Sequence, residues 1–243
     1  MSADETDDPA RRFFRRRWEV SQLPVSGVWL ARRRLAAAMR RVIERLTTSD
    51  APQAELEIAA ARLEDYAEHL GTQPRRDRYV GFSESALADA EREDEEAQGG
   101  GHFDYSPLIG RSNPLAPPIT VEADAEGNVT ARVVFGSAYE GPPGCVHGGY
   151  VAAAFDEVLG YAETFSGAPG MTGTLNVVYR TPTPLHTEVV FRAKIARVEG
   201  RKIFVHGTLH AGERLCAESD AIFVSMRAGR YLELMKERAE RSA

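Results

Sequence analysis

The sequence predicts an α+β fold in which an antiparallel sheet of six strands wraps around one long helix, preceded by an α-helical extension. Segments of alternating polarity recur across the C-terminal half, a long and almost wholly apolar segment follows the second of them, and two stripes of helical period occupy the N-terminal third. We therefore divide the chain into residues 1–101, a helical extension with a polar linker, and residues 102–243, the sheet domain.

The N-terminal extension is predicted to form an α-hairpin. Apolar residues recur from Val28 to Leu46 with arginines between them, and a second stripe runs to Leu70, just before Gly71. Acidic residues oppose the arginines, so we expect a solvated charged face. Left exposed, the apolar stripes would form too large a patch. We expect them to pack on the sheet domain or on its partner, through Leu35, Met39, Val42, Leu56, Leu63 and Tyr66.

The segments around this hairpin carry weaker signals. Residues 11–18 interleave arginine with aromatic residues, a pattern that can grip nucleic acid but that more simply forms a flexible or packed tail. Residues 72–101 are typical of an exposed linker. Residues 102–118 are expected to lead along the surface into the sheet domain, and residues 231–241 to form a short terminal helix.

The six strands follow from alternating polarity and from turn residues. Glu126-Gly127-Asn128 signals a hairpin between the first two strands, and Gly200 and Gly212 supply two later turns. The strands are expected at residues 119–124, 129–135, 172–181, 188–198, 202–210 and 214–226. The long helix falls between the second and the third.

The segment from Gly144 to Ala162 runs from a glycine-proline loop into this helix. A helix that is apolar on every face is normally buried all round, so Asp156 in its middle is expected to be taken out of water. Gly148 and Gly149 carry no side chains where the first free amides point outward, which is the layout of an oxyanion hole. Taken singly, the histidine before them could be a cap, the glycines a hinge, and Asp156 a partner for a neighbouring group. Together they indicate a site.

These residues resemble the hotdog-fold acyl-CoA thioesterases, in particular the phenylacetate-pathway type. The resemblance rests on His147-Gly148-Gly149 with Asp156 nine residues after the histidine, and it continues through residues 171–182, 198–205 and 216–224. It implies hydrolysis of an acyl-CoA substrate to free acid and coenzyme A, without a cofactor and without a metal.

The resemblance also assigns the catalytic roles. It places the oxyanion amide at Gly148 with Gly149 beside it, His147 orienting the loop before the helix, and Asp156 acting as base or nucleophile. Many members of the family carry an asparagine six residues before the histidine, whereas this chain has Gly141 there. The oxyanion hole is therefore expected to use backbone amides alone.

Further site residues follow from the same resemblance. Thr172 matches a position where relatives carry a Ser or Thr that positions the attacking water, and Thr174 is its local rival. Arg180, Arg201 and Lys202 fall where relatives contact coenzyme A, whose phosphates suit cationic side chains. Ordinary surface charges at strand ends explain these three equally well.

The spacing of the site residues argues for more than one chain. Nine residues span ~13.5 Å along an α-helix. One helix therefore cannot bring Gly148 and Asp156 to the same carbonyl, so we expect a site shared between two chains. The relatives are built as such dimers, and a homodimer or a dimer of dimers follows.

Composition constrains partners and location. The formal net charge of −6 makes nucleic acid an unlikely partner, no apolar run is long enough for a membrane span, and two cysteines far apart fit the cytoplasm. The alternative function is a non-catalytic acyl-CoA sensor whose N-terminal helices bind DNA, although a sensor would not need Asp156. Hydration of an enoyl-CoA is less supported, because no histidine follows Asp156 within the helix. The sequence leaves the acyl group open.

Overall fold

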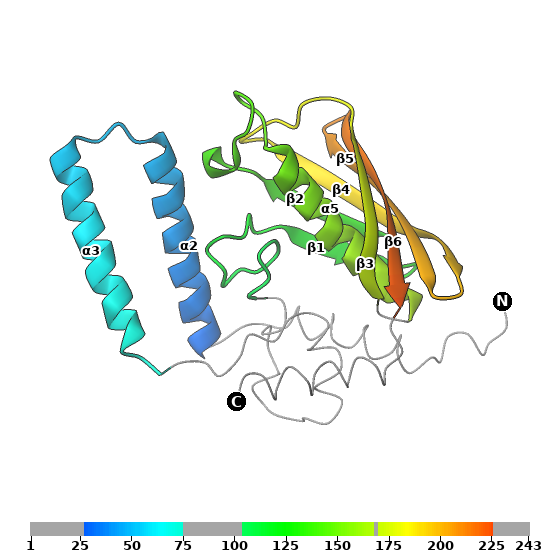
Figure 1. Ribbon diagram of the computed structural model, residues 1–243, viewed down its shortest axis with the longest axis horizontal. Helices are drawn as coiled ribbons and strands as arrows, with labels where there is room; N and C mark the ends of the chain where they lie inside the picture. The colour runs from blue at the N-terminus through cyan, green and yellow to red at the C-terminus, as the bar shows by residue number, and fades with distance from the viewer. Residues whose placement is uncertain (1–26, 75–103, 168–169, 226–243) are drawn as a thin grey trace.

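The computed structural model describes residues 27–74, 104–167 and 170–225. Two helices, α2 (Gly27–Thr48) and α3 (Gln53–Gly71), stand beside a curved sheet that holds α5 (Gly148–Glu163) on its inner face (Figure 1). The arginine-aromatic cluster of residues 11–18, the linker beyond residue 74 with the domain division at residue 101, and the terminal helix at 231–241 lie outside the described residues. None of the described helices is both long and apolar enough to cross a membrane.

The sheet has six antiparallel strands in the order β1-β2-β4-β5-β6-β3, so β1 and β3 form its two edges. The strands are β1 (Thr120–Ala123), β2 (Val129–Val134), β3 (Gly170–Tyr179), β4 (Glu188–Glu199), β5 (Lys202–Ala211) and β6 (Arg214–Ser225). All six predicted strands are confirmed, with ends that differ by no more than two residues. A sheet of this order wrapped around one helix is the hotdog arrangement that the sequence resemblance implied.

The helix packs closely on the middle of the sheet. In β5 alternate residues are buried against it: Ile203, Val205, Gly207 and Leu209. A Cβ atom at Gly207 would lie 2.8 Å from Cδ2 of Leu159 and 3.0 Å from the carbonyl oxygen of Arg192. Phe155 packs edge-to-face on Phe191 of β4, with ring centroids 5.0 Å apart. Glycine at position 207 therefore allows the helix to approach the sheet closely.

The prediction that this helix is buried on every face is wrong for the single chain. One side of α5 is buried against the sheet, whereas the side along the edge strand β3 is partly open, and Asp156 is only half-buried. The physical reason is the position of β3 at the edge, because among the described residues no further strand continues the sheet over that side. The partly or fully exposed residues of α5 are Gly148, Gly149, Tyr150, Ala152, Ala153, Asp156, Glu157 and Gly160.

Helix α2 docks through polar side chains. Arg33 donates two hydrogen bonds to the carboxylate of Asp104, at 2.8 and 2.6 Å. Arg40 donates to the backbone carbonyls of Arg111 and Asn113, in the same loop as Asp104. Glu44 accepts a hydrogen bond of 3.1 Å from the amide of Ser137, the first residue of the short helix η2 (Ser137–Tyr139). Residues 33, 40 and 44 are separated by seven and four positions and thus share one face of the helix.

The predicted packing of the apolar stripes on the sheet domain of the same chain is therefore wrong. Leu35 is half-buried, but Met39 and Val42 are exposed, and α3 has no buried residue at all. Helix α3 lies on the far side of α2 from the sheet (Figure 1). Packing of the exposed stripes on a partner remains a prediction. The predicted solvated face is also wrong for Arg33 and Arg40, which bind the 104–113 loop.

We expect the Arg33–Asp104 pair to hold α2 in place. The side chains are only 18% and 5% exposed, so Asp104→Ala leaves a largely buried guanidinium without its carboxylate. The free energy of unfolding, measured with denaturant, should fall by about 3 kcal/mol or more. The matched control is Glu199→Ala in the exposed Arg197–Glu199 pair, where about 0–1 kcal/mol is expected. Equal effects of the two substitutions would show that the buried pair does not stabilise the fold.

Candidate functional site

The start of α5 is organised by His147, which is its N-cap residue. The Nδ1 atom of His147 accepts a hydrogen bond of 3.0 Å from the amide of Gly149. The amide of Gly149 is thus already used, whereas in the described part of the chain the amide of Gly148 donates to no protein acceptor. The capping role that the sequence left open for His147 is present, and it leaves Gly148 as the available donor.

The loop before α5 is built around Gly141. A Cβ atom at this position would lie 2.7 Å from Cα of His147, so any larger residue must displace the loop. The amide of Gly141 donates to the carbonyl of Cys145 at 2.9 Å, which closes the loop. Glycine at position 141, where many relatives carry asparagine, therefore has a steric reason in this chain.

Tyr179, at the end of β3, ties the helix start to the edge strand. Its hydroxyl donates a hydrogen bond of 2.7 Å to the carbonyl oxygen of Gly148. Sequence reasoning missed this residue, because the contact joins positions 31 residues apart and leaves no local pattern. The contact fixes Gly148 beside the C-terminal end of β3.

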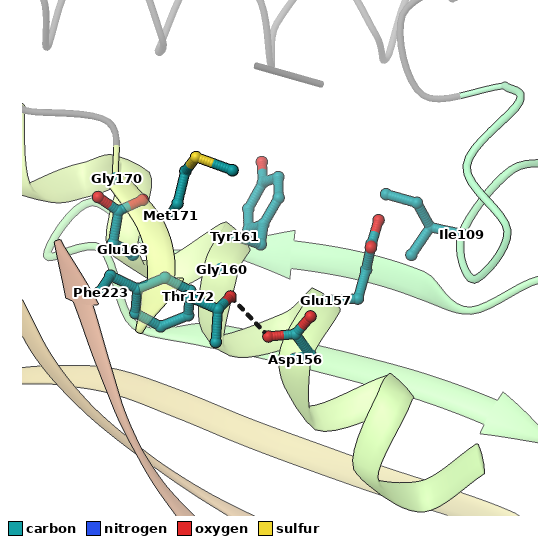
Figure 2. A pocket seen from close by; sticks show the side chains of 10 residues that line it. All are labelled: Ile109, Asp156, Glu157, Gly160, Tyr161, Glu163, Gly170, Met171, Thr172 and Phe223. Atoms are coloured by element: carbon teal, nitrogen blue, oxygen red, sulfur yellow. Dashed lines mark hydrogen bonds between the residues drawn. The ribbon is translucent and has the colours of Figure 1, made fainter. Parts of the chain in front are cut away.

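Asp156 and Thr172 meet near the other end of the same strand. The hydroxyl of Thr172 donates a hydrogen bond of 2.8 Å to Oδ1 of Asp156, as Figure 2 shows. Of the two threonines that the sequence offered for positioning the attacking water, Thr172 is thus the one that contacts Asp156, and its role in positioning water stays a prediction. A half-buried carboxylate held by one hydroxyl keeps its second oxygen available to a water molecule or a substrate.

A pocket of about 310 Å³ adjoins this pair. It is lined from α5, β3, β6 and the loop before β1, by Ile109, Asp156, Glu157, Gly160, Tyr161, Glu163, Gly170, Met171, Thr172 and Phe223 (Figure 2). Apolar and carboxyl groups thus share one concave surface beside Asp156. Such a combination is typical of a ligand site.

The pocket contains two carboxyl groups that sequence reasoning missed. Burial raises the pKa of Glu157, and although the hydroxyl of Ser106 donates to its Oε1 atom at 2.8 Å, the neighbouring Asp156 adds to the rise. Burial also raises the pKa of Glu163 to about 8, and the amide of Gly170 lowers it only in part. The available signal was the presence of three acids on an otherwise apolar helix.

The three predicted cationic residues do not form one cluster within the chain. Arg180 directly follows β3 and is ion-paired with Glu218 of β6. Arg201 lies at the opposite end of that strand pair, where its Nε atom donates to the carbonyl of Ser225 at 2.9 Å, and exposed Lys202 follows it. Ten residues of a β-strand span about 30 Å. Arg180 and Arg201 of one chain therefore cannot contact the same phosphate group.

Comparison with known proteins identifies the family. Residues 143–218 match the family model of the thioesterase superfamily. The crystal structure of a thioesterase superfamily protein is 31% identical to this chain and superposes with a TM-score of 0.69, covering 84% of this chain and 98% of the other. This chain belongs to the thioesterase superfamily.

Two curated relatives match part of this superfamily member. Acyl-coenzyme A thioesterase THEM4 of Xenopus laevis is 35% identical over 89 residues, which are 36% of this chain and 40% of the relative. The protein of the same name from Mus musculus is 36% identical over 89 residues, which are 36% of this chain and 38% of the relative. The chain thus spans less than half the length of these relatives.

The raised pKa of Glu163 predicts how stability depends on pH. The unfolded chain loses this proton near pH 4.5 and the folded chain near pH 8, so between these values the folded state binds more protons and stability falls as pH rises. Glu163→Gln removes the titration. From pH 4.5 to pH 8, its free energy of unfolding should rise relative to that of the wild type, by roughly a few kcal/mol. Denaturant unfolding at both pH values measures this change. A difference between variant and wild type that is the same at pH 4.5 and at pH 8 would contradict the prediction.

Proposed function

We propose that this protein is an acyl-CoA thioesterase, which hydrolyses the thioester to a free acid and coenzyme A. The observation that carries the proposal is the Asp156–Thr172 pair in a pocket, on the same helix whose first amide, that of Gly148, is available. The curated relatives, named acyl-coenzyme A thioesterases, support the same reaction.

The chemistry follows from these groups. Asp156 removes a proton from a water molecule held with the help of Thr172, and the water oxygen attacks the carbonyl carbon. The carbonyl oxygen takes up the negative charge and is stabilised by the amide of Gly148 of the partner subunit. The carbon–sulfur bond then breaks, and the departing thiolate receives the proton from Asp156. Direct attack by the carboxylate is the second route that this geometry serves, with water then hydrolysing the resulting anhydride.

We propose that two chains share each site through the β3 edge. Gly148 is anchored at the C-terminal end of β3 by Tyr179, and Asp156 is anchored near its N-terminal end by Thr172. If two β3 strands pair antiparallel about a two-fold axis, Gly148 of one chain lies opposite Asp156 of the other. The exposed side chains of β3 support this pairing.

The same symmetry suits the binding of coenzyme A. Arg180 lies at the C-terminal end of β3, and Arg201 and Lys202 lie near the N-terminal end. An antiparallel β3 pair brings Arg180 of one chain near Arg201 of the other, where both can bind phosphate groups. Gly149 has no side chain to obstruct the substrate as it approaches Gly148.

Two features bear on location and on the alternative function. Cys145 and Cys216 are both free, which supports a site of action in the reducing cytoplasm.

Arg33 and Arg40 of α2 bind the protein's own 104–113 loop. These two arginines therefore have less capacity to bind DNA, and the sensor hypothesis gains no support from α2.

Asp156→Asn should abolish most of the turnover. The substitution keeps the size of the side chain but removes the charge that accepts a proton, so kcat, measured by thiol release, should fall by at least ~10²-fold. Melting temperature and binding of coenzyme A should stay close to those of the wild type. The control is Asp220→Asn, which changes an exposed carboxylate of β6 paired with His206. Wild-type turnover in the Asp156 variant would rule out its catalytic role.

The shared site is tested at the two sheet edges. Asn176→Lys places like charges on facing β3 edges, so the dimer mass seen by light scattering should fall to that of a monomer, and activity should be lost with it. Thr120→Lys places the same charge on the opposite edge strand β1 and should leave dimer and activity intact. If the Asn176→Lys variant were monomeric and still active, each chain would hold a complete site.

A further inference from the structure

One face of α5 forms a wall of the pocket beside Asp156, which we call the groove. Asp156, Gly160 and Glu163 are separated by four and three positions, so they lie on one face of the helix, as Figure 2 shows. Gly160 has no side chain, and a Cβ atom there would lie 3.6 Å from the ring of Phe223, in ordinary contact. The groove therefore stays open between the two acids. Seven residues of helix place its ends about 10.5 Å apart.

Glu163 closes the end of this groove far from Asp156. The residue is only 2% exposed. Its carboxyl group lies against Gly170, and its Oε1 atom has no hydrogen-bond partner in the part of the chain that the structure describes. A buried polar atom without a partner is costly, and such atoms are rare in folded proteins. This oxygen therefore points to a ligand group that would complete its hydrogen bonding.

The protonation of Glu163 defines which group fits. With its pKa raised to about 8 by burial, the side chain is mainly a neutral carboxyl near pH 7, able to donate one hydrogen bond and to accept others. An alkyl end would leave Oε1 without a partner. A hydroxyl group can both accept from the carboxyl group and donate to it.

We propose that Glu163 forms a polar subsite for a hydroxyl group at the far end of the acyl chain, about 10.5 Å along α5 from Asp156. The substrate class is thus a medium-chain acyl-CoA that carries a terminal or near-terminal hydroxyl. This inference rests on the proposed thioesterase function, because Asp156 marks where the thioester carbonyl lies.

The test compares octanoyl-CoA with its ω-hydroxy derivative. Wild-type protein, Glu163→Gln and Glu163→Met are assayed by thiol release, and the ratio of kcat/KM for the two compounds is determined. The wild type should favour the hydroxylated compound by about tenfold, the gain from one hydrogen bond to a buried group. Glutamine both donates and accepts and should keep most of the preference, whereas methionine should bring the ratio close to one. A ratio near one in the wild type, or an unchanged ratio in the methionine variant, overturns the subsite.

A second variant tests the path of the groove. Gly160→Ala places a methyl group between Asp156 and Glu163, so KM should rise more for octanoyl-CoA than for butyryl-CoA, whose chain ends earlier. Equal changes for both compounds would show that the acyl chain lies elsewhere and would overturn the proposal.

Failure of the proposed function gives a different result. If the wild type hydrolyses neither compound, the thioesterase proposal fails, and the same two compounds are compared by calorimetry. Tighter binding of the hydroxylated compound that is lost in Glu163→Met would still support the subsite. Equal Kd values for the two compounds would overturn the subsite in addition to the thioesterase proposal.

Discussion

The close packing of α5 on β5 is the contact on which the rest of the structure depends. Because position 207 carries no side chain, Leu159 sits against the backbone of β5, and Phe155 meets Phe191 beside it. Once this face of the helix is fixed, its period of 3.6 residues fixes the directions of all other side chains. Asp156, the neighbour of Phe155, then faces the edge strand, and the side chain seven residues later faces the same way. The site is thus a consequence of core packing.

The position of the site at a sheet edge couples assembly to chemistry. An edge strand carries unpaired backbone groups that invite another strand, and proteins normally cover or blunt such edges. Here the edge strand β3 also anchors both halves of the proposed machinery, Gly148 through Tyr179 at one end and Asp156 through Thr172 at the other. A second chain that covers this edge would therefore complete the sheet and two sites in the same event.

The sheet was predictable because its signals are local, whereas the docking of α2 was not. Alternating polarity and turn glycines such as Gly200, whose φ is 58°, lie within each strand pair. The proposal that Thr172 belongs to the site came from the family resemblance. By contrast, the bond between Arg33 and Asp104 joins residues 71 positions apart, and the rule that an apolar stripe faces its own core led to the wrong face of α2. Glu163 was visible in the sequence, but its burial depends on how the end of α5 meets β3 and β6.

Two acids on one helix are suited to different tasks because their surroundings differ. Burial raises the pKa of Glu163 from 4.5 to about 8, a change that corresponds to roughly 5 kcal/mol. Repulsion from a charged Asp156 about 10.5 Å away would supply only roughly 2 kcal/mol at an effective dielectric constant near 20. Burial is therefore the larger cause, and Glu163 stays mainly neutral near pH 7 whether or not Asp156 carries its charge. The protonation of Glu163, proposed for substrate recognition, is thus largely independent of the charge of Asp156, proposed for catalysis.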